Sequence, residues 1–390
     1  MDQNHKILTR LGILAGAIAL AVVAYQGLQK SLLTAPKIVS TPLPTGEQNS
    51  GVGVYTDPTL NFTLEIPHSW DGYYKATPTT SDRPGGGPTP QVRFDYVNKE
   101  GKTIPLFYIA QTTEKNWRMI QALSSMLLTK LIQVENQVYY TEDARTYPRV
   151  AAQDTDAQYK KMSEEISRVL QTFSLFSPKT GMTIRNNKVV QEVFEKKLEI
   201  QNEYPVFISG QGIDNYAELN AAIENLVNQA TEITTRDMND NDVPVDEDIK
   251  NGFGISYTID LFTPERVSIE FNMYEYSRGA AHPNSFTQVL NFDLKTKKVL
   301  KLEDVFQTNK KYLERLSEIS FAGLTKQMEQ YEPDKEWLKR GTEPKAENFQ
   351  KFVFVPGGIK IIFDSYQVGP YVLGPQEVRI PTETIKDILQ

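Results

Sequence analysis

Strand-length segments in which every second residue is apolar recur along this chain, and they constrain its fold most strongly. Leu60, Phe62, Leu64 and Ile66 alternate with polar residues until Pro67 ends the run. Comparable runs lie at residues 91–97, 104–110, 254–262, 266–276, 285–293 and 358–363. Because successive side chains of a strand point to opposite faces, this pattern predicts sheets with one buried face.

Other segments follow the helical period. Apolar spacing predicts helices over about residues 113–128, 156–170, 214–233 and 310–330. Strands that alternate with a few helices are typical of the α+β class, here antiparallel sheets with helices packed on one face. Pro, Gly and Thr predict a loop over Thr77–Pro90, and alternating Lys and Glu predict one long strand over Glu192–Gln201.

Segments rich in proline and glycine divide the 390 residues into four parts. Residues 1–33 are predicted to form a short cytoplasmic end and a membrane helix, and residues 34–53 a flexible stalk. Two α+β domains are predicted to follow at 54–176 and 182–390, each within the usual size of a domain.

The N-terminal apolar segment predicts the compartment. Lys6 and Arg10 precede a charge-free run, so residues 11–28 are predicted to anchor the chain in the bacterial cytoplasmic membrane by a single pass with the N-terminus inside. Alternatively, Val22-Val23-Ala24 could be a cleavage site, and the chain would then be secreted. Both interpretations place the bulk of the chain outside the cytosol.

The amino-acid composition excludes several classes of function. The chain has no cysteine, which excludes disulfides and thiolate metal sites. Its net charge of −7 argues against a nucleic-acid partner. Residues 179–390 hold 25 Lys and Arg against 33 Asp and Glu, a net −8, so a cationic partner would be attracted to this part.

Residues suited to catalysis are scarce. His5, His68 and His282 are the only histidines, too few for an ordinary zinc site. No Gly-x-Ser-x-Gly motif occurs. We therefore predict a protein that is not an enzyme and needs no cofactor. His282 is interpreted as the anchor of a tight turn, with ligand contact and catalysis as the alternatives.

An acidic run permits a weak calcium hypothesis. Asp237, Asn239, Asn241 and Asp248 occupy ligand positions of an EF-hand loop, but Asp242 stands where that loop requires glycine. A solvated loop is the favoured interpretation.

Two blocks in the second half suggest a ligand-binding surface. A turn spans Ser277–Asn284, and an aromatic bend spans Tyr366–Tyr371. Tyrosine combines an apolar ring with a polar tip, which suits both a binding surface and a core. The candidate ligand-binding residues are Arg278, His282, Asn284, Tyr366 and Tyr371.

These blocks, with residues 286–306 and 361–381 around them, resemble the extracytoplasmic C-terminal domain family of the lysozyme-responsive anti-sigma factor RsiV and the peptidoglycan deacetylase PdaC. The resemblance covers about residues 190–390 and a domain of unknown function. It implies a place in the cell envelope and recognition of a protein such as lysozyme or of a wall component. In the first domain, the strand followed by Pro67-His68-Ser69-Trp70 resembles the opening of PsbP-like folds.

Three functions follow as hypotheses. The leading one is a membrane-anchored, non-catalytic binding or sensing protein of the cell envelope. The alternatives are an envelope enzyme acting on peptidoglycan and a structural assembly subunit. The deacetylase activity in this family belongs to a separate module, whose metal-binding Asp and His motifs are missing from this sequence.

Overall fold

The computed structural model describes residues 51–83, 87–123, 128–143, 156–177, 182–209, 216–236, 238, 249–308 and 311–390. All of them belong to the compact unit Gly51–Gln390. The predicted membrane segment 11–28 and the calcium candidates Asp237, Asn239, Asn241 and Asp248 lie outside the described residues. Among the residues described, no helix is both long and apolar enough to span a bilayer.

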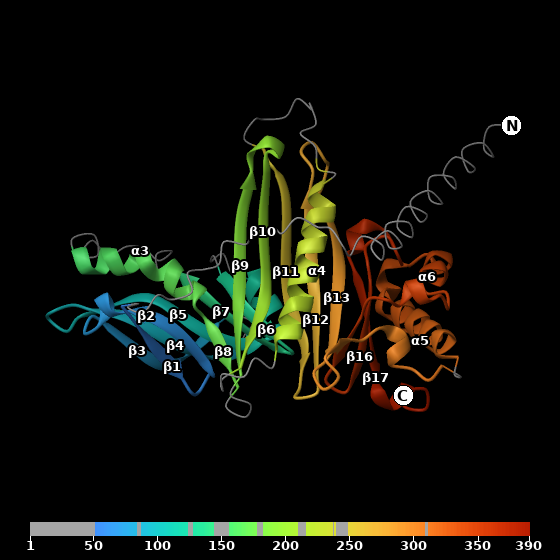
Figure 1. Cartoon of the computed structure of the whole chain (residues 1–390), viewed down its shortest axis with the longest axis horizontal. Coiled ribbons are helices and arrows are strands. Elements are labelled where there is room, and N and C mark those ends of the chain that lie inside the picture. The colour runs from blue at the N-terminus through green and yellow to red at the C-terminus, as the bar shows by residue number, and fades with distance from the viewer. Residues whose placement is uncertain are drawn as a thin grey trace. The chain divides into compact units, whose positions relative to one another are not determined.

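Strands dominate the described part of the chain (Figure 1). Their bounds are β1 Val52–Asp57, β2 Phe62–Pro67, β3 Tyr74–Arg83, β4 Gly87–Val97, β5 Thr103–Thr113, β6 Leu128–Val134, β7 Gln137–Asp143, β8 Ser174–Phe176, β9 Thr183–Val193, β10 Leu198–Ile208, β11 Asn251–Phe262, β12 Arg266–Tyr276, β13 Asn284–Asp293, β14 Lys298–Val299, β15 Phe352–Val355, β16 Gly358–Phe363 and β17 Gln376–Pro381. The helices are α2 Glu114–Leu123, α3 Ala157–Gln171, α4 Ala217–Arg236, α5 Tyr312–Gln327, α6 Lys335–Gly341 and α7 Thr382–Ile385. The predicted mixture of sheets and helices is confirmed.

The strands form two sheets. The larger has the order β1-β2-β8-β9-β10-β11-β6-β7-β5-β4-β3, with β12, β13 and β14 continuing from β11, and the smaller is β15-β16-β17. Most pairs are antiparallel, but β10 pairs with β11 in parallel. The prediction of antiparallel sheets therefore holds for most pairs and is wrong for β10 with β11 and for β11 with β6. Both predicted domains contribute strands to the larger sheet, and their division remains a prediction.

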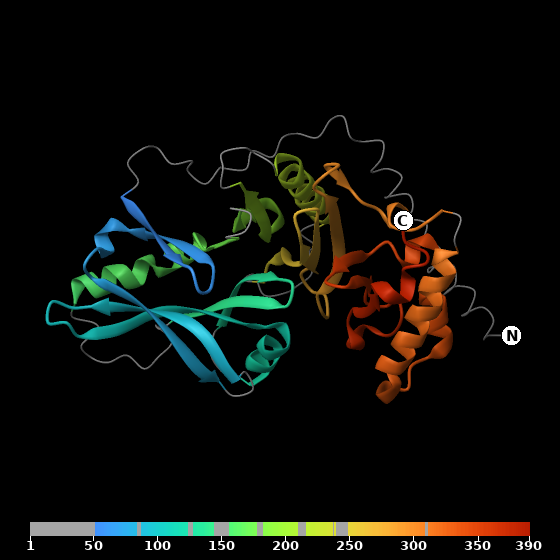
Figure 2. The same cartoon turned by 90° about the horizontal axis from the view of Figure 1, so that it is seen from below.

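Helix α4 covers one face of the larger sheet at β10 and β11 (Figures 1 and 2). Its buried residues Leu219, Ile223 and Val227 recur at helical spacing. The odd-numbered residues of β11 from Asn251 to Ile259 are buried, while the even-numbered residues up to Thr258 are not. The strand therefore keeps its apolar side under α4 and presents its other side away from the helix.

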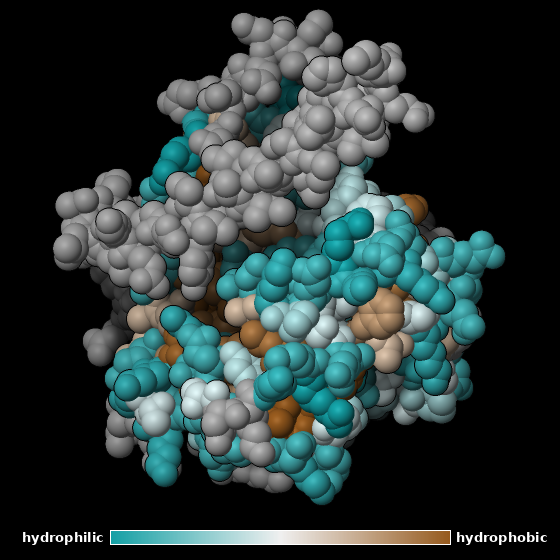
Figure 3. All heavy atoms as spheres, turned by 90° about the vertical axis from the view of Figure 1, so that its right-hand side faces the viewer, coloured by the Kyte–Doolittle hydropathy of each residue, from teal (hydrophilic) through white to brown (hydrophobic). Residues whose placement is uncertain are grey.

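Other helices belong to different parts of the structure. Helix α3 packs against β2, and α5 packs against β17 of the smaller sheet. The two long helices of the second half thus cover two different sheets, not one face as predicted. The surface on the side of α5 and α6 is mostly hydrophilic, with small separated apolar areas (Figure 3).

Two local predictions were wrong for related reasons. Thr77–Pro90 lies largely in β3 and β4, whose pairing places Pro78 opposite Val92 and Pro90 opposite Thr80. Glu192–Gln201 is not one strand, because Phe194–Lys196 turn the chain and Lys197 adopts a left-handed φ of 43° between β9 and β10. In both segments, cross-strand pairing decided a structure that local residue preference left open.

Candidate functional site

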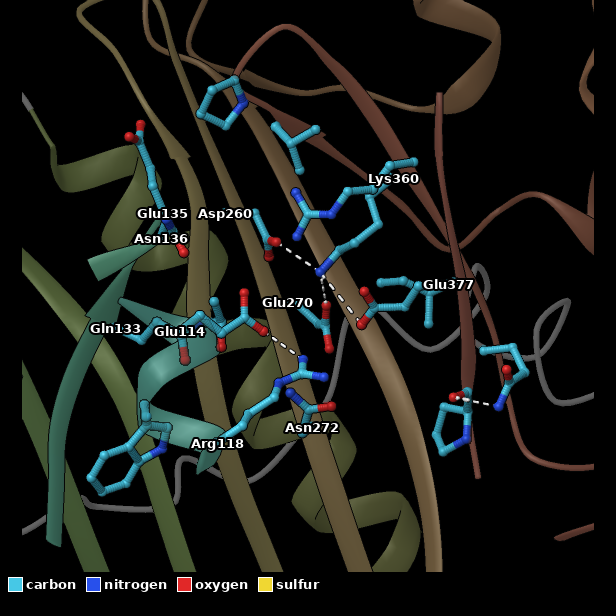
Figure 4. A pocket seen from close by; sticks show the side chains of 18 of the residues that line it. Glu114, Arg118, Gln133, Glu135, Asn136, Asp260, Glu270, Asn272, Lys360 and Glu377 are labelled. Atoms are coloured by element: carbon cyan, nitrogen blue, oxygen red, sulfur yellow. Dashed lines mark hydrogen bonds and ion pairs between the residues drawn. The ribbon is translucent and has the colours of Figure 1, made fainter. Parts of the chain in front are cut away.

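A cavity of about 760 Å³ is the candidate functional site (Figure 4). Strands β11 and β12, the smaller sheet and the region of α2 and β6 supply its walls. Its lining is mainly polar and charged, and includes Glu114, Arg118, Gln133, Glu135, Asn136, Asp260, Glu270, Asn272, Lys360, Glu377 and Arg379.

One ammonium group at the cavity wall is shared by three carboxylates. Lys360 Nζ lies 2.8 Å from Asp260 Oδ1, 2.6 Å from Glu270 Oε2 and 3.7 Å from Glu377 Oε1. We call these four residues the Lys360 cluster. Lys360 and Asp260 are only 4% and 5% exposed, so their charges are largely removed from water. Glu377 is more exposed and lies at the open side of the cluster.

Each member of the Lys360 cluster is placed by a strand. Lys360 lies in β16 between Ile359 and Ile361, and it pairs with Arg379 of β17. The register between β11 and β12 shifts between Ile259 and Leu261, so Asp260 is the extra residue of a bulge. Bulges redirect a side chain at the point where the ladder is interrupted, which explains how Asp260 meets a lysine of the other sheet.

Burial and ion pairing act in opposite directions on these groups. Burial alone would lower the pKa of Lys360, but the carboxylates of Asp260, Glu270 and Glu377 raise it above its ordinary value. Burial raises the pKa of Asp260 to about 7, and the attraction of Lys360 only partly offsets that effect. Lys360 is therefore a permanent cation, whereas Asp260 exchanges its proton near neutral pH.

The raised pKa of Asp260 predicts a pH-dependent stability. The folded protein holds this proton more tightly than the unfolded chain, in which the carboxyl has its ordinary pKa of 3.8. Its contribution to the free energy of unfolding is therefore complete below about pH 4 and falls as the pH rises toward 7, by up to ~1.4 kcal/mol per pH unit. Asp260→Asn mimics the protonated acid, so between pH 5 and pH 7.5 the variant loses less stability than the unaltered protein in urea unfolding.

Asp387→Asn, at an exposed carboxylate outside the cavity, serves as control and leaves the pH dependence unchanged. Parallel profiles for Asp260→Asn and the unaltered protein would contradict the assignment.

The residues predicted from sequence lie away from the cavity lining, and the structure brings three of them together. The rings of His282 and Tyr371 stack with centroids 4.2 Å apart, and the ring of Tyr366 lies 5.6 Å from that of Tyr371. The hydroxyl of Tyr371 donates to the carbonyl oxygen of Pro283 at 2.6 Å, and His282 Nδ1 lies 2.9 Å from the same oxygen. The turn and the aromatic bend are therefore joined into one aromatic cluster.

The other two predicted residues, Arg278 and Asn284, differ in how exposed they are. Arg278 is 7% exposed, and its backbone N–H donates to Asn251 Oδ1. Asn284 is exposed at the first position of β13. Asn284 is therefore accessible at the surface, whereas Arg278 is largely buried.

The sequence analysis missed the whole Lys360 cluster. A weak signal existed, because Lys360 lies between two isoleucines and Asp260 lies between Ile259 and Leu261. A charged residue within an apolar strand indicates either an outward face or a buried partner, and only the fold distinguishes the two. The described residues contain no group of three or more His, Cys, Asp or Glu suited to a metal ion.

The fold and the cavity define a sheet-dominated mixed α/β protein with a charged, polar cavity. Residues 303–383 match the family described as "Protein of unknown function (DUF3298)". The chain is 35% identical over 141 residues to the peptidoglycan-N-acetylmuramic acid deacetylase PdaC of Bacillus subtilis. That match covers 36% of this chain and spans only 30% of the length of the deacetylase.

Two solved structures of DUF3298 proteins are also similar. One, from Bacteroides fragilis, has a TM-score of 0.43 at 17% identity, and the other, from Pseudomonas aeruginosa, has a TM-score of 0.40 at 16% identity. Each match covers 54% of this chain and 94% of the other. The predicted resemblance is confirmed for this family and for the deacetylase, while similarity to the anti-sigma factor remains a prediction.

Proposed function

We propose that this chain is a non-catalytic binding protein of the bacterial cell envelope, which holds a glycan of the wall in the cavity at the Lys360 cluster. Residues 11–28 would anchor it in the cytoplasmic membrane and leave residues 51–390 outside. Similarity to a protein named as a peptidoglycan deacetylase supports the envelope and the wall as its context.

The polar chemistry of the cavity wall is the observation that carries the proposal. The cavity wall presents carboxylates, amides and guanidinium groups, the types of group that hydrogen-bond hydroxyl-rich ligands. Asp260 Oδ2 is buried and has no hydrogen-bond partner among the described residues. A ligand hydroxyl or ammonium group would supply that partner and remove the cost of an unsatisfied buried acceptor.

A second function, an enzyme acting on the same glycan, is favoured by the pKa of Asp260. A carboxyl group that titrates near pH 7 can donate a proton at neutral pH, as a general acid must. We prefer binding because Glu270, the nearest second carboxylate, is held by Lys360 at 2.6 Å and is not free to act as a base beside Asp260.

The binding test uses the full chain, purified in mild detergent, and purified peptidoglycan sacculi. We expect saturable co-sedimentation that Asn272→Ala, at an exposed residue of the cavity, weakens. Gln288→Ala, exposed and outside the cavity lining, is the matched control. Binding to lysozyme without binding to sacculi would overturn the proposal in favour of a protein ligand. Release of soluble fragments by the unaltered chain, lost in Asp260→Asn, would overturn it in favour of an enzyme.

Cell fractionation tests the proposed compartment. We expect the full chain in the membrane fraction, with residues beyond 51 accessible to protease added from outside. Recovery of the intact chain from the cytosol would contradict the compartment.

A further inference from the structure

The face of the larger sheet opposite α4 presents an uninterrupted row of polar side chains and glycines. The register of β11 and β12 pairs Gly252 with Tyr276, Gly254 with Tyr274, Ser256 with Asn272 and Thr258 with Glu270. Strand β10 adds Glu199 beside Gly252 and Gln201 beside Gly254. No aliphatic side chain belongs to this row.

A second cavity, of about 510 Å³, lies over this row at the end formed by Gly252 and Tyr276. Asn272 lines both this cavity and the one at the Lys360 cluster. The two cavities therefore adjoin at Asn272 on one face of the sheet, and we call the strip of β11 and β12 that they line, from Gly252 to Asp260, the trough. At about 3.3 Å per residue, the trough is about 25 Å long, a length suited to an extended polymer.

Glycine and tyrosine shape the second cavity. A Cβ atom at Gly252 would lie 3.3 Å from the ring of Tyr274, and one at Gly254 would lie 3.2 Å from the carbonyl oxygen of Gln201. The Tyr274 ring therefore packs over Gly252, where only glycine leaves room for it, and the ring remains 45% exposed. A flat aromatic face beside hydrogen-bonding groups suits a ring-shaped ligand with polar edges.

Charge determines which polymer fits the trough. Seven carboxyl groups and four cationic side chains line the two cavities, so the lining stays net negative even when Asp260 is protonated. Among the cations, Arg118 pairs with Glu114, and Lys360 is shared by its three carboxylates. Lys250 pairs with Glu192. An anionic polymer would be repelled, whereas a polymer with ammonium groups would be attracted.

We propose that the trough along β11 and β12 binds a linear glycan that carries free amino groups, with Tyr274 against a sugar ring and Asp260 accepting from the deepest donor. This proposal rests on the proposed function and specifies its ligand. The Asp260 oxygen without a partner lies at one end of the trough, and the tyrosine-walled cavity lies at the other. A ligand that uses both ends must be several sugar units long.

Isothermal titration of the full chain with glucosamine oligomers, from dimer to hexamer, tests the proposal, with the N-acetylated oligomers in parallel. We expect affinity to rise by more than about tenfold from dimer to hexamer, and the amino form to bind more tightly than the acetylated form. Tyr274→Ala is expected to weaken hexamer binding by roughly 2- to 10-fold. Tyr331→Ala, at a tyrosine 60% exposed outside both cavities, is the matched control and leaves it unchanged.

A pair of opposite charges at Ser256 tests the electrostatic part without disturbing the core, because this residue is exposed. Ser256→Lys should weaken binding of the amino hexamer about 2- to 5-fold, and Ser256→Glu should strengthen it by a similar factor. Equal effects of both substitutions would contradict the charge argument.

The possible failures can be told apart. Binding of sacculi with no dependence on oligomer length or amino groups would overturn the trough and leave the proposed function intact. If the unaltered chain bound no glycan at all, both the trough proposal and the proposed function would be overturned. Tight binding of lysozyme that Tyr274→Ala weakens, without glycan binding, would assign the trough to a cationic protein instead.

Discussion

Lys360→Met is expected to lower the free energy of unfolding at pH 7 by about 3–5 kcal/mol, because it leaves buried carboxylates without their cation. Methionine matches the length of the lysine stem, so the loss reports charge more than packing. The measurement is urea unfolding of the full chain, followed by tryptophan fluorescence.

The loss in Lys360→Met should shrink at pH 5, because the carboxyl group of Asp260 is then protonated and needs no cation. Asp260→Asn added to the same chain should also reduce the loss. Lys345→Met is the matched control. Its side chain is 57% exposed and pairs with Glu343 at 2.6 Å, and such a surface pair contributes little to stability because water screens it. Similar losses for the two lysine variants would show that the Lys360 cluster is not an electrostatic unit.

Trp70→Ala is expected to cost about 3–5 kcal/mol of stability, because it removes a large side chain from the core. Trp70 has no exposed surface, and its Nε1 donates to Glu165 Oε2 of α3 at 2.7 Å. The substitution would both open a cavity and leave the carboxylate of Glu165 without this donor. Urea unfolding at pH 7 measures the effect.

Phe194→Ala is the control for Trp70→Ala, since Phe194 is an aromatic residue that is 81% exposed at the turn between β9 and β10. We expect its effect to stay within about 0.5 kcal/mol. A loss below roughly 1 kcal/mol for Trp70→Ala would mean that α3 does not depend on this contact.

Local pattern predicted the elements well where one face is buried. Arg266–Tyr276 and Gly358–Phe363 have the predicted bounds, and α3 begins one residue after its cap Asp156, which accepts from the N–H groups of Gln158 and Tyr159. These segments succeed because alternation, helical period and capping act within a few residues of the chain. Thr77–Pro90 failed because the proline-rich segment gains its pairing from a strand that local preference does not reveal.

Sequence revealed one part of the candidate site, and only the fold revealed the other. Sequence singled out His282, Tyr366 and Tyr371, and their rings do lie together, yet only the fold shows that the hydroxyl of Tyr371 reaches the turn at Pro283. The Lys360 cluster joins residues that lie 90 positions apart, such as Glu270 and Lys360, so no local pattern could indicate it.

By itself the sequence determined most of the strands and long helices, the absence of cysteine chemistry and the acidic character of the second half, because these properties depend on near neighbours or on composition alone. The tertiary structure alone decided the parallel pairing of β10 with β11, the bulge at Asp260 and the trough on the polar face of the sheet. Each of these depends on strand register, and register is set by which distant segments bury their apolar faces together.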